Sequence, residues 1–442
     1  MRMIHVFSFK DYNYVYDVGS GSLHECDKAT AEYLKTRYEE GGDFSHFPPE
    51  LIEAAERDVA PLIKAGTLFA DEVKAYPVKS EEIKALCLHI CHDCNLRCKY
   101  CFADEGAYHS ERAFMSEETA KKAVDFLIAN SGARRVLEID FFGGEPLMCL
   151  NTVKNVVAYA KAEGEKRGKK FLFTTTTNAL LLNDEAIEFF NAEMENVVLS
   201  LDGRPEVHDA VRKTVNGKGS FEHVVGNAER FVASRGDRHY YVRGTFTAKN
   251  LDFSNDVIYL AERGFDSISM EPVVTDIKEL EITPEHLPAI CAEYEALAEK
   301  YLTKYESGQG FNFFHFNIDL EGGPCLAKRC SACGAGNEYF SVTPNGDIYP
   351  CHQFAGDEKY KMGNVYEGQV DKNLRNEFAS NNLFTRKGCE NCFAKFICSG
   401  GCSANNYRFA GDVNNPYTIT CEMMKKRTEC AMHLLARKKS QI

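Results

Sequence analysis

Residues 86–101 read Leu86-Cys-Leu-His-Ile90-Cys-His-Asp-Cys94-Asn-Leu-Arg-Cys98-Lys-Tyr-Cys101. The stretch begins with a short apolar run, Leu86 to Ile90, which predicts a buried β-strand. Three cysteines with C-x3-C-x2-C spacing follow that strand directly. Ligands of α/β sheets bind beyond the carboxyl ends of the strands, so we expect these cysteines to lie at the functional edge of a sheet.

From residue 86 to 273, short apolar runs alternate with amphipathic segments, as in repeated βα units that carry a parallel sheet. After the first strand, Ser116 is a helix N-cap, and a buried stripe at helical spacing follows it. The stripe comprises Ala120, Ala123, Val124, Leu127 and Ile128. The six predicted strands are Leu86 to Ile90, Val136 to Phe142, Phe171 to Thr176, Val197 to Leu201, Tyr240 to Phe246 and Ser267 to Glu271. The fold class is therefore α/β, a partial (β/α)6 TIM-like barrel.

Composition excludes several classes of protein. The 442 residues predict two to four domains, and 52 basic against 65 acidic residues give a net charge of −13. This charge disfavours nucleic acid as a partner, since nothing drives binding to phosphates. No stretch approaches the ~18 apolar residues of a membrane span, and the first residues lack the apolar region of a secretory signal. We therefore expect a cytoplasmic protein that binds no membrane.

The 18 cysteines need an explanation other than disulfides, because reduced thiols in a cytosolic chain usually indicate metal or redox chemistry. Only Cys26 precedes Cys87, a second group runs from Cys87 to Cys101, and ten cysteines lie between Cys325 and Cys430. The cysteines alone therefore divide the chain into three regions.

The group Cys94, Cys98 and Cys101 can hold three irons of a 4Fe-4S cube and leave the fourth iron open, whereas structural zinc requires four ligands. An open iron can chelate the amine and carboxylate of S-adenosylmethionine (SAM), which one electron then cleaves to a 5′-deoxyadenosyl radical. With the aromatic Tyr100, the motif resembles the signature of the radical SAM superfamily. The alternative is a zinc loop completed by Cys91, His89 or His92.

The resemblance implies cofactor contacts at the ends of later strands. Gly143-Gly144-Glu145-Pro146 follows the second strand, and such a stretch binds the methionine amine in the family; paired glycines also allow close backbone approach. Contacts to ribose, carboxylate and adenine are implied for Asn178, Ser200, Asp202, Arg243, Met270 and Glu271. A plain turn, structural caps and surface ion pairs are the alternatives. Ala179 departs from the family, where glycine often follows the asparagine.

The C-terminal cysteines resemble the SPASM extension of radical SAM enzymes that modify peptides. By that resemblance one auxiliary 4Fe-4S cluster, the distal cluster, is bound by Cys389, Cys392, Cys398 and Cys421. The other, the proximal cluster, is bound by Cys333, Cys351 and Cys402, with Cys325 or Cys330 as a fourth ligand or none. Zinc ribbons are the alternative. Five cysteines fit no spacing and are expected to be buried inert thiols: Cys26, Cys87, Cys149, Cys291 and Cys430.

The N-terminal part of the chain, 1–80, predicts a small β-then-α unit. The segment 3–25 reads as a hairpin or meander, helices are expected over Ala29 to Arg37 and Pro49 to Ala65, and a short strand over Thr67 to Phe69. A decoration that packs on the main domain is one interpretation of this unit.

End to end, the chain resembles the maturases of SCIFF peptides (six cysteines in forty-five residues), which make thioether cross-links in ribosomally synthesised, cysteine-rich precursors. The matching stretches are residues 4–7, 22–24, 94–102, 333–338 and 343–354. The resemblance implies a winged-helix-like recognition unit at 1–80, whose exposed third strand adds the leader peptide of the precursor as a further strand. It also implies the barrel at 81–280, a helical linker at 281–322, a SPASM region at 323–442, three 4Fe-4S clusters, and an electron donor such as flavodoxin or ferredoxin.

Two other functions fit parts of this pattern. A maturase that oxidises a Cys or Ser of a sulfatase to formylglycine shares the SPASM layout but generally lacks the N-terminal unit. A non-catalytic, zinc-binding peptide scaffold would keep the cysteines but gives no reason for Gly143 to Pro146 and Asp202 at strand ends. Metal analysis separates iron from zinc.

Overall fold

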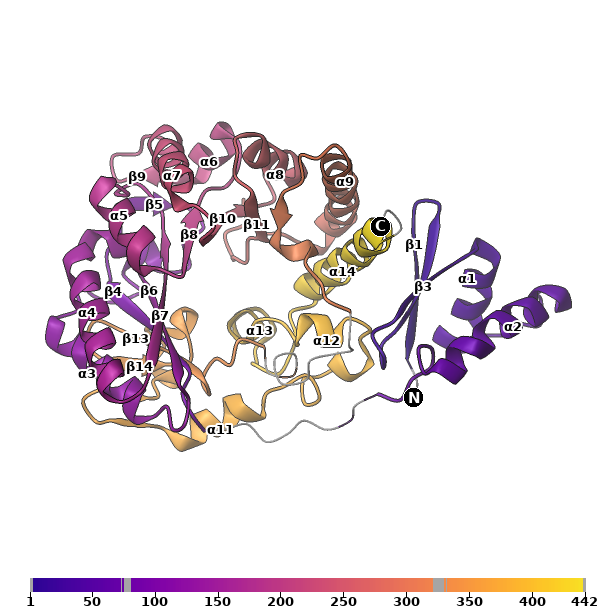
Figure 1. The fold of residues 1–442 in the computed structure, drawn as a ribbon, viewed down its shortest axis with the longest axis horizontal. Helices are drawn as coiled ribbons and strands as arrows, with labels where there is room; N and C mark the ends of the chain where they lie inside the picture. The colour runs from indigo at the N-terminus through magenta and orange to yellow at the C-terminus, as the bar shows by residue number, and fades with distance from the viewer. Residues whose placement is uncertain (1–2, 73, 75–80, 321–329, 331, 440–442) are drawn as a thin grey trace.

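The computed structural model describes residues 3–72, 74, 81–320, 330 and 332–439, and its centre is a curved parallel sheet with helices on its outer side (Figure 1). The sheet order is β12-β11-β10-β8-β7-β6-β4-β13-β14-β15-β16. Its six central strands run parallel and are β4 (Ala85–Cys91), β6 (Val136–Gly143), β7 (Lys170–Thr177), β8 (Asn196–Ser200), β10 (His239–Phe246) and β11 (Ser267–Pro272). The predicted α/β partial barrel is confirmed.

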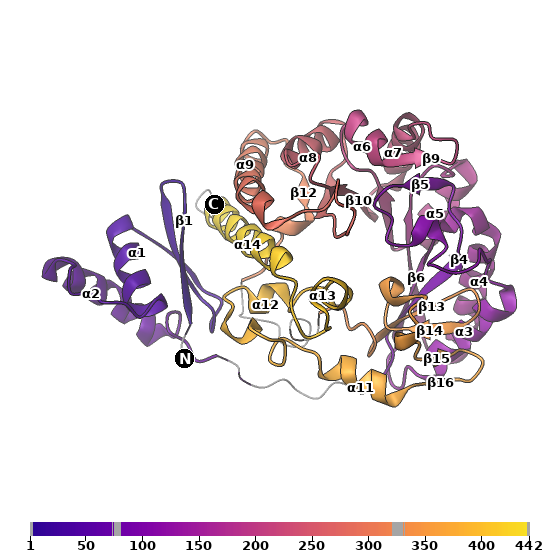
Figure 2. The same cartoon turned by 180° about the vertical axis from the view of Figure 1, so that it is seen from behind.

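Helices cover the convex face of this sheet, as both side views show (Figures 1 and 2). They are α3 (Glu117–Ala129), α4 (Leu150–Lys166), α5 (Asp184–Glu193), α6 (Pro205–Val211), α7 (Phe221–Arg235) and α8 (Phe253–Glu262). Helix α3 begins as predicted, because the Ser116 hydroxyl accepts a hydrogen bond from Thr119 N at 3.0 Å. Its Val124 and Leu127 are fully buried, each contributing about 1.5–3 kcal/mol of hydrophobic stabilisation.

The strands alternate apolar side chains toward the helices with polar side chains toward the interior of the barrel. In β6, Ile139 and Phe141 are fully buried under the helices, while Asp140 occupies the other face. The same period of two separates Val242 from Arg243 in β10. The interior face therefore collects the groups that can contact a ligand.

The sheet extends further at both ends than the sequence predicts. Strand β12 (Asn312–Phe313) pairs with β11, so the predicted helical linker contains helix α9 (Leu287–Glu306) and also a strand. At the other end, β13 (Tyr339–Val342) pairs in parallel with β4 and starts an antiparallel extension. That extension is β14 (Asp347–Tyr349), β15 (Gly363–Asn364) and β16 (Gln369–Val370). Strands of two to four residues carry no readable periodicity, which is why they were not predicted.

The remaining described elements are short and lie mostly in the C-terminal region, which crosses the open side of the barrel (Figure 2). Strand β5 (Leu96–Cys98) pairs with β9 (Arg212–Thr214). The C-terminal helices are α11 (Lys372–Ser380), α12 (Lys395–Cys398), α13 (Ser403–Ala410) and α14 (Thr418–Lys439). The 3-10 turns are η2 (Asp104–Gly106), η3 (Pro146–Cys149), η4 (Pro284–His286), η5 (Phe314–Phe316), η6 (His352–Phe354), η7 (Glu358–Tyr360) and η8 (Cys389–Asn391).

The N-terminal unit (residues 3–72) is a three-stranded antiparallel sheet followed by helices. Its elements are β1 (Ile4–Phe9), β2 (Tyr12–Asp17), β3 (Leu23–Cys26), α1 (Lys28–Leu34), the π-helical turn η1 (Lys35–Glu39) and α2 (Pro49–Ala65). The expected strand over Thr67 to Phe69 is wrong. Thr67 N instead donates to Leu62 O at 3.0 Å and completes the end of α2, while Phe69 has a positive φ of 53°. The third strand is β3.

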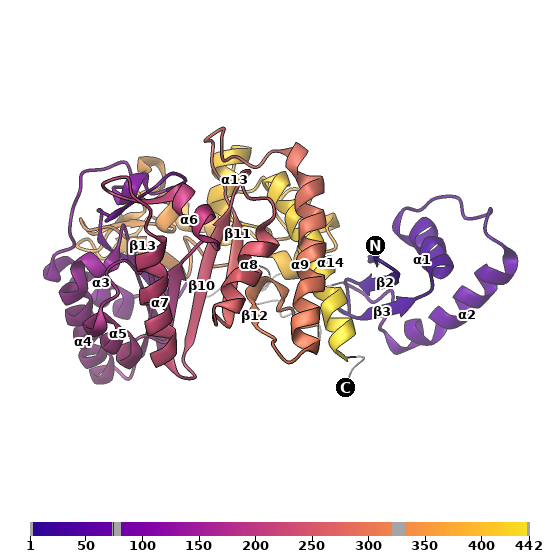
Figure 3. The ribbon, with the colours of Figure 1, turned by 90° about the horizontal axis from the view of Figure 1, so that it is seen from above.

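Helix α14 carries the N-terminal unit, as the view from above shows (Figure 3). One face of the small sheet buries Ile4 and Val6 with α1 and α2. The other face places Phe9 on His433 of α14, with ring centroids 3.9 Å apart. Among the described residues, we find no helix whose length and hydropathy suffice for a membrane span.

Candidate active site in the barrel cavity

A cavity of about 810 Å³ opens at the carboxyl ends of the barrel strands. Its walls come from the cysteine loop after β4, from the ends of β6, β7, β8, β10 and β11, and from the C-terminal region. Seven thiols line it: Cys94, Cys98, Cys101, Cys333, Cys398, Cys402 and Cys421. The cavity thus brings the cysteine loop after the first barrel strand together with cysteines from the C-terminal end of the chain.

The cysteine loop is held by β9, whose Arg212 pairs with Cys98 across the two short strands. Burial raises the pKa of the Cys94 thiol to about 12 and that of Cys98 to about 11, and the neighbouring thiols add to both shifts. A set of crowded thiols deprotonates when a bound cation compensates the negative charge. Three such thiols on one loop facing a cavity therefore fit an iron–sulfur cluster with an open position.

Gly143 and Gly144 let the end of β6 lie directly against the cysteine loop. Gly143 has φ +123°, and a Cβ there would lie 2.3 Å from Cys91 O. A Cβ on Gly144 would lie 1.8 Å from Asp93 O. Larger residues at these two positions would force the loop away, because backbone cannot yield as a flexible side chain does.

Glu145 is 1% exposed, and its carboxylate ties β6 to β7. It accepts hydrogen bonds from Thr177 Oγ1 at 2.7 Å and from Asn178 N at 2.8 Å. Burial raises the pKa of this carboxyl, and these donors lower it. Asn178 in turn directs its Nδ2 to Cys94 Sγ at 3.6 Å. Ala179, which departs from the glycine often seen in the family, has φ +61°, a conformation that glycine adopts more easily.

Asp202 is fully buried and does not line the cavity, but it positions two residues that do. Its Oδ2 accepts from the Tyr100 hydroxyl at 2.5 Å and from Arg212 Nε at 2.9 Å. The Arg212 guanidinium lies over the Tyr100 ring, 5.4 Å from its centroid, and Nη1 is 3.9 Å from Cys98 Sγ. Arg212 was not predicted, because only the pairing of β9 with β5 brings it to the loop.

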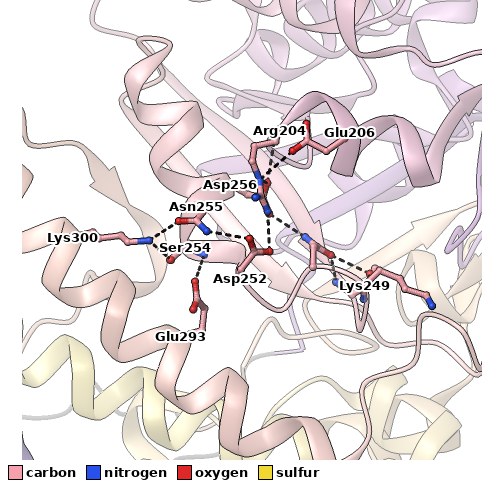
Figure 4. Close-up of polar contacts among 11 residues, drawn as sticks. Arg204, Glu206, Lys249, Asp252, Ser254, Asn255, Asp256, Glu293 and Lys300 are labelled. Carbon is pink, nitrogen blue, oxygen red and sulfur yellow. Dashed lines mark hydrogen bonds and ion pairs between the residues drawn. The ribbon is translucent and has the colours of Figure 1, made fainter.

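The segment carrying Asp202 is anchored from behind by a charge network at the start of α8 (Figure 4). Arg204 Nε lies 2.8 Å from Asp256 Oδ1, and Arg204 N donates to the same oxygen at 3.0 Å. Between them, Gly203 has φ +122°, and a Cβ there would lie 2.3 Å from Asp256 Cβ. Asp256 thus fixes the backbone directly after Asp202.

The far wall of the cavity carries a second charged group around Glu271. Its Oε1 lies 3.4 Å from His315 Nε2 and its Oε2 lies 3.6 Å from Arg427 Nη1 on α14. Burial alone would raise the pKa of this carboxyl, but His315, Arg427 and Arg243 lower it to about 2. Ser200 and Arg243 also line the cavity. Met270 does not: the strand period turns it into the apolar core beneath the helices, where it is fully buried.

The C-terminal thiols form two sets. Cys351 and Cys402 lie near each other and near Cys333, and desolvation raises the pKa of the Cys351 and Cys402 thiols. The second set is Cys389, Cys392, Cys398 and Cys421, whose mutual repulsion adds to the burial that raises the pKa of Cys389 to about 11 and of Cys421 to about 12. These are the two ligand sets that the sequence analysis separated.

Arg386 lies near both C-terminal sets and was not predicted. Burial lowers its pKa, while Cys389, Cys333, Cys398 and Cys402 raise it. Its guanidinium also donates to Gly401 O at 2.8 Å. A buried cation between two thiol-rich sites favours the charged forms of both.

The fourth proximal ligand falls partly outside the described chain. Cys325 lies outside the described residues, and Cys330 is fully buried in the apolar core, with its carbonyl accepting from Leu383 N at 3.0 Å. Of the five cysteines expected to be inert, Cys87 and Cys430 are buried, whereas Cys26, Cys149 and Cys291 are partly exposed.

Comparison with known proteins gives the class. Residues 88–246 match the radical SAM superfamily, and residues 333–393 match the SPASM iron–sulfur cluster-binding domain. The serine-type anaerobic sulfatase-maturating enzyme of Bacteroides thetaiotaomicron is 28% identical over 74% of this chain and 84% of its own. The cyclopropyl synthase TigE of Paramaledivibacter caminithermalis is 24% identical over 78% of this chain and 73% of its own.

Two solved structures share the fold. The sulfatase-maturating enzyme anSMEcpe with bound AdoMet has a TM-score of 0.68 at 20% identity, covering 82% of this chain and 96% of its own. SuiB of Streptococcus suis bound to S-adenosylmethionine has a TM-score of 0.54 at 19% identity, covering 94% of this chain and 98% of its own.

The protein therefore carries a radical SAM domain and a SPASM domain, and it is homologous to anaerobic sulfatase-maturating enzymes and peptide maturases. The radical SAM domain binds S-adenosylmethionine and a 4Fe-4S cluster, and the SPASM domain binds additional iron–sulfur clusters.

Proposed function

We propose that this protein is a radical SAM peptide maturase that installs thioether cross-links in a ribosomally synthesised, cysteine-rich precursor. In this proposal Cys94, Cys98 and Cys101 hold the cluster that binds SAM. The distal cluster is held by Cys389, Cys392, Cys398 and Cys421, and the proximal cluster by Cys333, Cys351 and Cys402. The holoprotein then contains three 4Fe-4S clusters and receives electrons from a flavodoxin or ferredoxin.

One observation carries the proposal: thiols of all three sets line the same cavity. A thioether forms between a cysteine sulfur and a carbon of another residue, so both partners must reach one reaction space. Cys101 lies on one wall of this cavity and Cys333 and Cys402 lie on another. A peptide in the cavity can therefore present its carbon to one cluster and its thiol to a second.

When bound and reduced, the SAM-binding cluster supplies the electron that yields the 5′-deoxyadenosyl radical, which removes hydrogen from the acceptor residue. The protein side chains position and charge this site. Glu145 fixes the end of β7, and Asn178 holds Cys94. Arg212, fixed by Asp202, presents a cation beside Cys98 that suits an anionic group of the cofactor.

The N-terminal unit supports recognition of a leader peptide. In β3, hydrogen-bonded and non-bonded pairs alternate, starting from Asp17 N to Ser22 O at 2.9 Å. The N–H groups of Leu23 and Glu25 then point away from β2, toward the free edge of the sheet. An extended leader can add to this edge as a further strand through main-chain hydrogen bonds.

We place the domain boundaries at residues 1–80, 81–280, 281–322 and 323–442, with β12 and β13 extending the barrel sheet from the last two. The experiment is reaction of the anaerobically reconstituted full chain with SAM, reductant and a cysteine-rich precursor encoded beside its gene. Each cross-link should remove two hydrogen atoms from the peptide mass and one thiol from alkylation. Unchanged precursor in the presence of SAM cleavage would overturn the thioether assignment.

A formylglycine-forming activity is the second candidate, because the sulfatase-maturating enzyme of Bacteroides thetaiotaomicron is 28% identical to this chain. Oxidation of a seryl side chain also removes two hydrogen atoms, so mass alone does not separate the two products. An aldehyde reacts with a hydrazide reagent and a thioether does not. A zinc-loaded preparation without iron and sulfide would instead favour the non-catalytic scaffold.

A further inference from the structure

The N-terminal unit contacts the loop from Cys389 to Cys398 at two separate points. His5 on β1 reaches Phe393, and Glu72 at the end of the unit reaches Lys395. Both partners lie inside the stretch that carries three of the four proposed ligands of the distal cluster. These contacts join segments from opposite ends of the chain.

His5 is stacked on Phe393 and held in that position from two sides. The ring centroids are 3.5 Å apart with an interplanar angle of 7°. His5 Nδ1 lies 2.8 Å from Glu39 Oε1, and Nε2 lies 2.9 Å from Glu429 Oε1. Phe393 directly follows Cys392, so the stack restricts the backbone that carries this ligand.

Glu72 forms an ion pair with Lys395, and both side chains are nearly inaccessible, at 10% and 4% exposure. Lys395 Nζ also donates to Glu390 O at 3.0 Å, across the bend of the loop. The ammonium thus links Glu390, next to Cys389, to the N-terminal unit. A buried cation of this kind requires its carboxylate partner, because an unpaired charge is poorly tolerated away from water.

The fourth ligand is tied to the same unit through α14. Cys421 lies in the first turn of this helix, and Glu429 and His433 further along it contact His5 and Tyr14. All four distal ligands therefore lie on segments that the N-terminal unit holds. Neither the loop nor α14 needs the unit for its own hydrogen bonds, so these contacts add an external constraint.

From this geometry we infer that His5 and Glu72 are positioning residues of the distal cluster, and that the N-terminal unit is part of the wall of that cluster site. The inference rests on the ligand set in the proposed function. A unit that captures the leader peptide is then also required to retain an iron–sulfur cluster. Release of the unit from α14 would expose the loop that holds Cys392.

The test is the kinetics of iron release from the reconstituted full chain by an iron chelator, without SAM or peptide. The distal phase is identified as the one missing from a Cys389→Ala, Cys392→Ala, Cys398→Ala variant. In His5→Ala and in Glu72→Gln we expect this phase to be about tenfold faster, and the other two phases unchanged, as for residues that support metal ligands. Lys10→Ala is the matched control, since Lys10 contacts Glu299 of α9 and not the loop.

The outcomes separate the inference from the proposed function. If the wild type lacks a phase assignable to these cysteines, the ligand set itself is wrong. If that phase is present but equally slow in His5→Ala, Glu72→Gln and Lys10→Ala, the positioning role is overturned and the clusters stand. Glu72→Gln keeps the shape of the side chain, so it remains informative where His5→Ala disturbs folding. Mössbauer spectra of the partly released protein report which cluster has been lost.

Discussion

The guanidinium of Arg212 donates to the thiol of Cys98, with Nη1 3.9 Å from Sγ, and Asp202 holds it there through Nε at 2.9 Å. This geometry places a fixed cation beside the cluster loop. We predict that Arg212→Gln lowers SAM affinity about tenfold, because a charge-assisted contact contributes about 1.5–3 kcal/mol. Equilibrium dialysis with SAM measures the loss. Lys213→Gln on the same strand is the control, and equal affinity in both variants would contradict the role of Arg212.

Replacing Cys94, Cys98 and Cys101 together with Ala should abolish reductive cleavage of SAM but leave about two thirds of the iron, since two of three cubes remain. The C-terminal thiol sets are separate from this loop, because they begin only at Cys333, beyond the last strand of the barrel. Iron and sulfide analysis and the yield of 5′-deoxyadenosine measure the two effects. SAM cleavage at the wild-type rate in this variant would refute radical chemistry at the loop.

The barrel could be predicted from sequence because its signals are local. Each of the six central strands begins and ends within one residue of its predicted bounds, since alternating apolar runs and an N-cap such as Ser116 are read directly from the chain. Arg212 and Arg386 could not be found in this way. Each reaches its thiols through pairing or burial between segments far apart in sequence, and no periodicity encodes such contacts. The strand expected at Thr67 failed because the end of α2 used its backbone.

Glu25→Pro tests addition of the leader peptide to the free edge of β3. Proline removes the outward N–H of residue 25 but spares the hydrogen bonds between β3 and β2, and edge strands tolerate it. We expect leader binding about tenfold weaker, because one peptide carbonyl is left without its donor. Glu25→Ala is the control: it also removes the ion pair with Arg437 but keeps the N–H. Fluorescence anisotropy with labelled leader measures both, and equal affinity would argue against strand addition.

His433 predicts how docking of the N-terminal unit depends on pH. Burial and Arg437 lower its pKa from 6.5 to about 4, partly offset by Glu299, and Tyr14 Oη lies 2.9 Å from its Nδ1. The undocked state therefore binds a proton between pH 6.5 and 4 that the docked state does not, and docking weakens as pH falls through this window. Hydrogen exchange of the β1 and β2 amides measures the opening free energy. His433→Phe keeps the stack on Phe9 and should flatten this dependence; an unchanged slope would exclude His433 as its source.

The proximal site makes a further prediction about the substrate thiol. Cys333 and Cys402 line the cavity, whereas Cys330 is buried in the apolar core. Three thiols leave one iron of a cube open, as at the SAM-binding loop. A substrate thiol bound there would lose its proton and hold its sulfur in place for bond formation. Addition of the precursor should therefore change the spectrum of the proximal cluster.

The control for this prediction is a precursor in which the donor Cys is replaced by Ser, which should bind the leader site equally and leave the spectrum unchanged. If Cys330 closes the site instead, Cys330→Ala should increase the spectral response to the precursor without loss of the cluster. The Cys87 thiol, which lies near Cys351 but is fully buried, offers a matched variant that should have no such effect. The measurement is electron paramagnetic resonance of the reduced protein, with the other two clusters removed by substitution of their ligands. A spectrum indifferent to the donor cysteine, with cross-linking intact, would leave the auxiliary clusters as electron carriers, because outer-sphere transfer requires no bond between iron and the substrate sulfur.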